Sequence, residues 1–199
     1  MQQITKLSVS RATDASFLLF ADSDIQFIDA LSPEDVVHGA ALRLYSEPGK
    51  MNTGQHLQWH EIASDLLGIE RKYAGFNYNG QLISWRRSDL QALHEHLENK
   101  HQRAWAEVIG RCTTVSEYIL FGNFVERVQS NIDTDYYRTD RSLVYSCWNA
   151  EQLSAFNDKQ AVLPQDIKAI HLQSNLGLSN LEEQQLISAA ISRRQHDHS

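Results

Sequence analysis

Apolar residues recur along this chain in two patterns, as short continuous runs and at helical spacing. The run Phe17-Leu18-Leu19-Phe20 predicts a strand buried on both faces, as in a parallel sheet that helices cover. Further apolar stretches of strand length occupy residues 41–45, 76–85, 143–147 and 167–172. Helical patterns separate these stretches, and this alternation predicts an α/β domain built on a mixed sheet.

Apolar positions on one helix face, together with capping residues, predict the helices. We expect helical segments at 2–12, after Ser32-Pro33, at 59–67 with Gly68 as its end, after Ser88, at 105–109, at 114–128, after Asn149 and at 181–191. In the helix after Ser88, His94 and His96 point to different sides, and we expect both to be solvated. Residues 46–55 are expected to form a loop, and Asn79-Gly80 is a turn signal inside 76–85.

Two carboxylates, Asp22 and Asp24, directly follow the first apolar run. Strand residues two apart point the same way, and ligands of open α/β sheets bind at the carboxyl ends of strands. Two carboxylates there offer hard oxygen ligands to Mg²⁺ or Mn²⁺, and a metal so held can bridge to a diphosphate. The pattern indicates a metal-dependent transferase with a nucleotide-linked donor. The alternative is an ordinary turn, because aspartate favours turns and the motif is short.

A histidine ends the last predicted strand in the same way. If the strand that contains His171 lies beside the strand before Asp24, an imidazole and two carboxylates meet at one sheet edge, a ligand set that suits Mn²⁺ better than Ca²⁺. The alternative is a structural histidine. Gln173 and Ser174 follow, and they are either donors for phosphate and sugar hydroxyls or plain loop residues.

Other candidates each have a structural alternative. Glu117 completes a capping box with Thr114, or it serves as a general base or hydrogen-bond partner that faces a sugar or acceptor. Asn79-Gly80 is a tight turn or a place where the backbone approaches a ligand closely. Lys6 is a surface lysine or a contact for the donor diphosphate.

Composition narrows the classes of function. The formal charge of −7 disfavours non-specific nucleic-acid binding. The two cysteines, Cys112 and Cys147, have no metal-type spacing, and we expect buried thiols rather than a disulfide. The first residues lack the apolar core of a signal peptide, and no apolar run approaches membrane-spanning length, so the prediction is a cytoplasmic protein without an integral membrane segment.

Taken in order, several segments resemble the landmarks of GT-A glycosyltransferases of the glycogenin-like branch. The likeness is strongest to a family of uncharacterised bacterial glycosyltransferase-like proteins, and it covers the chain from its start to about Leu178. The segments are Ile4-Thr5-Lys6-Leu7, Phe17 to Asp24, Asn79-Gly80, Ser116-Glu117-Tyr118-Ile119-Leu120 with Phe121-Gly122, and Ile170-His171.

This resemblance implies a mostly parallel sheet and a transfer reaction from a nucleotide-sugar donor to a carbohydrate or other hydroxyl acceptor. It further implies roles for individual residues: Asp22, Asp24 and His171 as ligands of Mn²⁺ or Mg²⁺, Glu117 as the catalytic residue, Lys6, Gln173 and Ser174 as donor contacts, and Asn79, Gly80 and Tyr118 as sugar or acceptor contacts.

The chain departs from the family pattern at two places. GT-A enzymes precede this point with two βα units that hold the nucleotide, so residues 1–178 are expected to be an N-terminally truncated GT-A-like domain, with 179–199 a C-terminal helix and tail. Related enzymes also follow their histidine with a lysine, whereas Leu172-Gln173-Ser174 follows His171. Two alternatives stay open: a non-catalytic sugar- or metal-binding protein, and a phosphatase of the haloacid dehalogenase type, whose second aspartate is normally followed by Gly-Thr and not by Ile25-Gln26.

Overall fold

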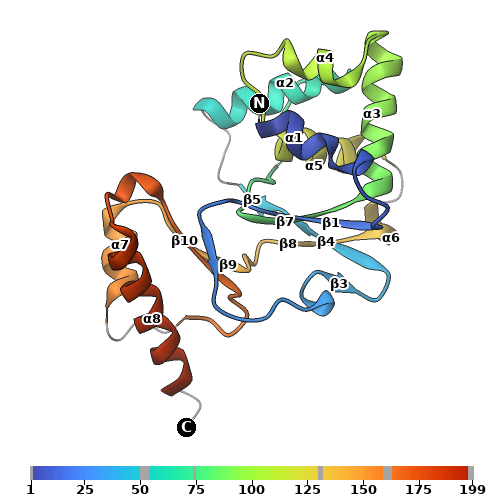
Figure 1. Ribbon diagram of the computed structural model, residues 1–199. Coiled ribbons are helices and arrows are strands. Elements are labelled where there is room, and N and C mark those ends of the chain that lie inside the picture. The colour runs from blue at the N-terminus through green and yellow to red at the C-terminus, as the bar shows by residue number, and fades with distance from the viewer. Residues whose placement is uncertain (1, 50–53, 74, 130–131, 159–162, 197–199) are drawn as a thin grey trace. The chain divides into compact units, whose positions relative to one another are not determined.

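The chain forms two compact units, each assembled from separate segments of sequence. The computed structural model describes residues 2–49, 54–73, 75–129, 132–158 and 163–196 (Figure 1). Unit 1 contains residues 1–20 and 33–141, and unit 2 contains residues 21–32 and 142–199. The expected boundary after residue 178 falls inside unit 2. Residues 50–53 of the predicted loop and 197–199 of the predicted tail lie outside the described residues.

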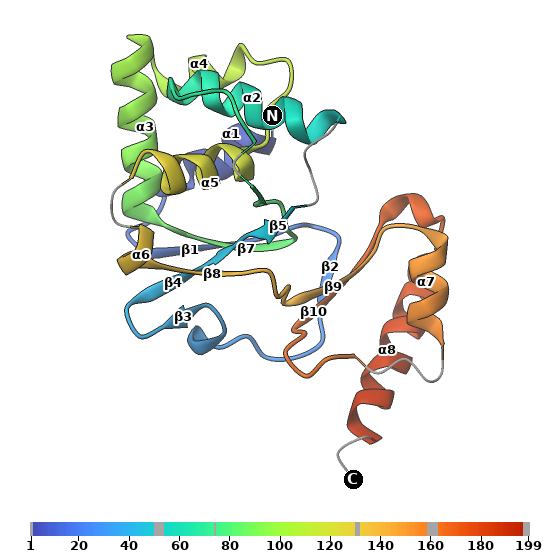
Figure 2. The same cartoon turned by 180° about the vertical axis from the view of Figure 1, so that it is seen from behind.

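Unit 1 combines short strands with a layer of helices. Its strands are β1 (Phe17–Ala21), β3 (Val37–His38), β4 (Ala41–Tyr45), β5 (Glu47–Pro48), β6 (Phe76–Asn77), β7 (Leu82–Arg86) and β8 (Tyr136–Thr139). Its α-helices are α1 (Gln2–Ser8), α2 (Gly54–Leu67), α3 (Arg87–His101), α4 (Trp105–Gly110), α5 (Glu117–Arg127) and α6 (Ile132–Asp135), with 3-10 helices at Val9–Arg11 and Pro33–Asp35. In Figures 1 and 2 the helices α1 to α5 lie on one face of β1, β7, β4 and β8.

The strands of unit 1 form small mixed sheets. β4 pairs with β3 in antiparallel and with β8 in parallel orientation. β1 pairs with β7, and the Ser84 hydroxyl of β7 donates to the Arg43 carbonyl of β4 at 2.7 Å. β5 and β6 form a separate antiparallel pair. The α/β class is therefore confirmed, with small mixed sheets.

The core of unit 1 lies between its strands and helices. Trp85 of β7 stacks on Phe121 of α5 with ring centroids 4.4 Å apart. Next to Phe121, a Cβ on Gly122 would lie 2.2 Å from the ring of the buried Tyr78. Helix α5 can therefore approach Tyr78 this closely only because residue 122 is glycine.

The first apolar run is buried on one face, not on both as its composition predicted. Leu18 and Phe20 are 6% and 7% exposed, whereas Phe17 and Leu19 are 41% and 42% exposed. The guanidinium of Arg86 lies 5.4 Å from the centre of the Phe17 ring and partly covers it. A run of apolar residues does not show how many elements cover a strand, and in this fold one face of β1 stays open.

Unit 2 has its own sheet and its own core. Its elements are β2 (Ile25–Phe27), β9 (Val144–Cys147), α7 (Ala150–Asn157), β10 (Ala169–Leu172), a 3-10 helix (Ser174–Leu176) and α8 (Asn180–His196). β10 is central, antiparallel to β2 and parallel to β9. Phe156 of α7 and Ile187 of α8 pack with Ile170 and Leu172 of β10 in one buried cluster.

Two helix starts differ from the prediction. Arg86, not Ser88, is the N-cap of α3, so Ser88 lies inside the helix. Ser116, not Thr114, is the N-cap of α5 and accepts a hydrogen bond from the Ile119 amide at 3.3 Å. The side chain of Asn149 caps α7 as predicted, by accepting from the Gln152 amide.

The remaining sequence expectations concern membrane spans and cysteines. In the part of the chain that the structure describes, no helix combines the length and apolar character needed to cross a membrane. Cys112 and Cys147 are both free thiols, as predicted. Cys147 is buried, and Cys112 is half-buried.

Candidate functional site

The two acids of the Asp-x-Asp motif lie in the connection between β1 and β2. The Ile25 amide donates to the Asp22 carbonyl at 3.4 Å, which closes a turn over residues 22–25. The acids are therefore turn residues, and the strand rule that made them point the same way does not apply to them. Asp22 is half-buried, and Asp24 is exposed.

Asp24 and His171 meet in unit 2. The antiparallel pairing of β2 and β10 sets His171 opposite Ile25, the residue after Asp24. The Nε2 atom of His171 lies 3.2 Å from Oδ2 of Asp24. The histidine side chain is 2% exposed and that of the aspartate 37% exposed. A buried imidazole and a solvent-accessible carboxylate thus face each other at the start of β2.

Trp148 lies against the same histidine. Its ring centroid is 4.5 Å from that of His171, with an interplanar angle of 56°. It follows β9 directly, and because β9 is parallel to β10 the ends of the two strands lie at one sheet edge. Trp148 is 48% exposed although its neighbour is buried. Trp148 is not among the residues predicted from the sequence, and its position after a predicted strand and before the capping Asn149 was the available signal.

The other predicted residues of unit 2, Gln173 and Ser174, follow β10 directly in the sequence. Gln173 is half-buried, and its amide donates to the Cys147 carbonyl at 3.0 Å. Ser174 is exposed and begins the 3-10 helix. This backbone hydrogen bond holds the ends of β9 and β10 together.

The 3.2 Å between His171 Nε2 and Asp24 Oδ2 is the length of a direct hydrogen bond, and it is also compatible with two neighbouring ligands of a metal ion. Two neighbouring ligands of an octahedral ion with bonds of about 2.1 Å lie about 3.0 Å apart, close to the observed separation. Among residues 2–49, 54–73, 75–129, 132–158 and 163–196, no three or more His, Cys, Asp and Glu side chains are grouped so that they could hold a metal. Of the predicted ligands Asp22, Asp24 and His171, the structure thus brings the last two together. Ions such as Mg²⁺ commonly take one or two protein ligands and complete their shell with water and phosphate.

A second set of predicted residues meets in unit 1. The Lys6 ammonium lies 3.1 Å from Oε1 of Glu117 and 2.5 Å from the Tyr118 hydroxyl. The Lys6 and Glu117 side chains are 13% and 7% exposed. Lys6 also lies 4.3 Å from the centre of the Tyr118 ring. These residues form a buried ion pair braced by an aromatic ring, in place of the surface lysine that was the alternative for Lys6.

The capping alternative for Glu117 is wrong. The helix begins at Glu117 itself, so this residue is not three positions inside the helix as a capping box requires. The Thr114 hydroxyl instead accepts a hydrogen bond from the Trp59 indole at 2.9 Å. The sequence pattern was present, but Thr114 has a different partner.

Asn79 joins this region through the cap of α5. The Ser116 hydroxyl donates to Oδ1 of Asn79 at 2.7 Å. No turn is assigned at residues 79 and 80, and they do not join a hairpin, because β6 and β7 pair with β5 and β1 and not with each other. A Cβ on Gly80 would lie 2.8 Å from Cδ1 of Ile83, so the chain passes close to that side chain.

A buried polar network in unit 1 was missed from the sequence. His60 of α2 is fully buried, and its Nδ1 accepts from the Asn123 side chain at 3.1 Å. Arg127 donates to both Asn123 and Ser64, at 3.2 and 3.1 Å. Burial, followed by the Arg127 charge, lowers the pKa of His60 to about 4. The spacing of four residues between His60 and Ser64 and between Asn123 and Arg127 was the signal that two helix faces carry this network.

His94 is buried, not solvated as predicted. Its ring stacks on Trp105 with centroids 4.2 Å apart and an interplanar angle of 6°. Burial, followed by the Arg11 charge, lowers the pKa of His94 to about 4. His96 is half-buried, and its Nε2 lies 2.9 Å from the Leu67 carbonyl. Both histidines therefore serve the packing of α3 rather than a solvated face.

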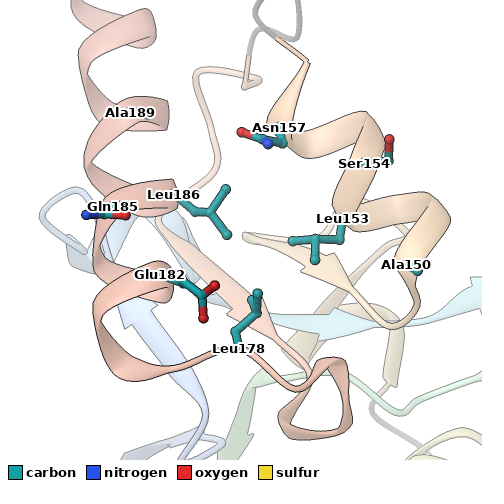
Figure 3. Close-up of a pocket in the computed structure, with 9 residues that line it drawn as sticks. All are labelled: Ala150, Leu153, Ser154, Asn157, Leu178, Glu182, Gln185, Leu186 and Ala189. Carbon is teal, nitrogen blue, oxygen red and sulfur yellow. The ribbon is translucent and has the colours of Figure 1, made fainter.

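A cleft of about 530 Å³ lies between α7 and α8 in unit 2. Figure 3 shows leucines of both helices and of the segment before α8 pointing into it. Its lining residues are Ala150, Leu153, Ser154, Asn157, Leu178, Glu182, Gln185, Leu186 and Ala189. None of the residues predicted to bind metal, donor or acceptor is among them.

Comparisons with other proteins place the chain in a family without assigning an activity. Searches of curated proteins and of solved structures give no match. One family model, described as a family of unknown function, matches residues 1–194. Because the match covers nearly the whole chain, this protein belongs to the family of unknown function DUF6492.

Proposed function

We propose that this protein is a GT-A-like glycosyltransferase that moves a sugar from a nucleoside diphosphate donor to a hydroxyl acceptor with the help of a divalent cation. The contact between Asp24 and His171, residues 147 positions apart in the chain, is the observation that supports the proposal most directly. Both residues are among the metal ligands that the resemblance to GT-A enzymes implies.

Asp24 and His171 would hold Mn²⁺ or Mg²⁺ through Oδ2 and Nε2. When bound, such a cation supplies positive charge to a departing nucleoside diphosphate. Mixed nitrogen and oxygen ligation suits Mn²⁺ better than Ca²⁺. The burial of His171 fixes its ring, and the exposure of Asp24 leaves the carboxylate open to solvent, so the protein side of the site is held in place while its outer side can accept phosphate oxygens.

The roles of the remaining residues are part of the same proposal. Within unit 1, Glu117 would orient a sugar or acceptor hydroxyl. Within unit 2, Gln173 and Ser174, which follow β10 directly, would contact donor phosphates. The 3.1 Å ion pair with Lys6 holds the Glu117 carboxylate in one position, as a hydrogen-bond acceptor for a hydroxyl must be held.

A non-catalytic sugar- or metal-binding protein is the second candidate. The observation in its favour is the same ion pair, because a lysine held by Glu117 and Tyr118 is less available to a phosphate than a free one. In this alternative Lys6 and Glu117 stabilise unit 1, and the Asp24–His171 pair binds a cation without a transfer reaction.

Titration with MnCl₂, alone and with UDP or GDP, tests the proposal by isothermal calorimetry. We expect wild-type protein to bind Mn²⁺ more tightly when a nucleoside diphosphate is present. Loss of an outer-shell partner alone typically weakens metal binding 10- to 100-fold, so Asp24→Ala is expected to weaken it at least about tenfold. Asp14→Ala, which removes a fully exposed carboxylate of unit 1, is the matched control and is expected to bind as wild type does.

Equal Mn²⁺ affinity in wild type and Asp24→Ala would remove the metal assignment. Binding of Mn²⁺ without any effect of UDP or GDP would favour the non-catalytic protein. Hydrolysis of a donor sugar that depends on both Asp24 and Glu117 would favour the enzyme.

A further inference from the structure

We infer that Trp148 is the platform on which the sugar ring of the donor stacks, and that it sets the preference of the site for a sugar nucleotide over a free nucleoside diphosphate. The inference rests on the proposed function, because it places the sugar relative to the Asp24–His171 pair. It adds a residue that neither the sequence motifs nor the family resemblance selected.

The backbone of Trp148 is fixed although its ring is open to solvent. The Trp148 amide donates to Oε1 of Gln152 at 2.7 Å. The preceding residue, Cys147, accepts from the Gln173 amide at 3.0 Å, and the next residue, Asn149, caps α7. An aromatic side chain on a rigid backbone loses little conformational freedom when a ligand stacks on it.

The ring of Trp148 is half-exposed beside polar groups. Its 48% exposure contrasts with the burial of Trp85 and Trp105, at 1% and 2%. The Trp148 ring contacts the His171 ring in a tilted arrangement. Trp148 is thus about half exposed at the sheet edge where the Asp24 carboxylate is also accessible.

This combination of groups suits a sugar ring. A pyranose presents C–H groups on its flat side and hydroxyls around its rim, and the π face of an indole carries partial negative charge that attracts the C–H side. A carboxylate accepts hydrogen bonds from hydroxyls, and Asp24, which faces the same histidine that Trp148 contacts, supplies such a group.

Distance favours the sugar over the nucleobase as the stacked group. The Trp148 ring centroid is only 4.5 Å from that of His171. A ligand group stacked on Trp148 would therefore lie close to the cation that His171 helps to hold. In a sugar nucleotide the sugar is bonded directly to the diphosphate, whereas the base is separated from it by the ribose. A diphosphate bound through a cation at Asp24 and His171 would therefore bring the sugar to Trp148 before the base.

Binding of sugar nucleotides compared with free nucleoside diphosphates tests the inference. The probes are UDP-glucose, UDP-galactose, UDP-N-acetylglucosamine and GDP-mannose, each measured against UDP or GDP in MnCl₂ by calorimetry. We expect Trp148→Ala to weaken binding of the preferred sugar nucleotide about fivefold to tenfold. The affinities for Mn²⁺ and for the free nucleoside diphosphate are expected to stay at wild-type values, and Trp148→Phe is expected to restore most of the loss.

Phe27→Ala is the matched control, because Phe27 is the other strongly exposed aromatic residue of unit 2, at 46%. It is expected to bind every probe as wild type does. Circular dichroism and the thermal midpoint of each variant confirm that it is folded.

Results that differ from these expectations overturn either the stacking role of Trp148 or the proposed function. Unchanged sugar-nucleotide affinity in Trp148→Ala, or an equal loss for the sugar nucleotide and the free diphosphate, overturns the stacking role and leaves the proposed function intact. The same holds if wild-type protein binds UDP or GDP but prefers none of the sugar nucleotides. If wild-type protein binds neither Mn²⁺ nor any nucleotide, the proposed function fails and the stacking role with it.

Discussion

Replacement of Glu117 by alanine is expected to lower the free energy of unfolding by about 3–5 kcal/mol, the range found when one partner of a buried ion pair is removed. Lys6 loses the carboxylate 3.1 Å from its ammonium, and its side chain is only 13% exposed, so water replaces little of the lost interaction. Urea unfolding followed by circular dichroism measures the change.

A double-mutant cycle separates the pair from the two residues taken singly. The cycle compares Lys6→Met, Glu117→Leu and the protein that carries both changes. We expect the double variant to be more stable than Glu117→Leu alone, because neither charge is left without its partner. Glu107→Ala is the surface control. Glu107 pairs with Arg103 and Arg111 in contacts that leave each side chain about half exposed, and its loss is expected to cost no more than about 1 kcal/mol. An equal cost for Glu107→Ala and Glu117→Ala would show that the buried pair contributes no special stability.

Acidification is expected to destabilise unit 1 through two buried histidines. His60 and His94 have folded-state pKa values lowered from 6.5 to about 4 by burial. Because the unfolded chain binds these protons first, the stabilising contribution is complete above about pH 6.5, declines as the pH falls below that value, and is lost near pH 4. At about 1.4 kcal/mol for each pH unit of difference, each imidazole contributes roughly 3 kcal/mol.

Neighbouring charges and hydrogen bonds also shift the pKa values of the two histidines. Arg127 and His56 lower the pKa of His60, and the Asn123 hydrogen bond raises it. Arg11 lowers the pKa of His94, and Glu98 raises it. Burial also raises the pKa of Asp89, which stabilises the folded chain on acidification and partly offsets the histidines.

Variants that cannot titrate isolate the histidine contribution. His94→Phe keeps an aromatic ring against Trp105, and we expect it to reduce the loss of unfolding free energy between pH 7 and pH 4.5, as measured in urea at several pH values. His60→Gln is expected to do the same while lowering stability at neutral pH. His38→Gln, at an exposed position of β3, is the control. A pH dependence that is the same in all these variants and in wild type would contradict the assignment.

Local sequence signals predicted the elements of this fold well where one residue or one spacing decides them. The apolar stretch at 41–45 is β4, Asn149 is the N-cap of α7, and Gly68 follows the end of α2 with φ of +69°. These features depend on neighbours in sequence.

Features that depend on distant partners were harder to predict. The composition of β1 could not show that one of its faces stays exposed, and the helical spacing of His94 could not show that Trp105 covers it. Glu117 fitted a capping pattern, yet its partner is Lys6, 111 positions away. Trp148 gave no motif at all, because its interest comes from its place beside His171.

The approach of Asp24 to His171 is the feature on which the functional account depends. Strand-end positions and the family resemblance predicted it, whereas the place of Asp22 in the same ligand set stays a prediction. The turn at residues 22–25 and the register of β2 against β10 explain why Asp24, rather than any strand residue, faces the imidazole.

Electron spin-echo envelope modulation of the protein loaded with Mn²⁺ and UDP tests this account most directly, because it detects nitrogen atoms bound to the ion. The account predicts ¹⁴N modulation from an imidazole in wild-type protein and its loss in His171→Gln. A spectrum with water and phosphate couplings alone, or nitrogen modulation that persists in His171→Gln, would contradict it.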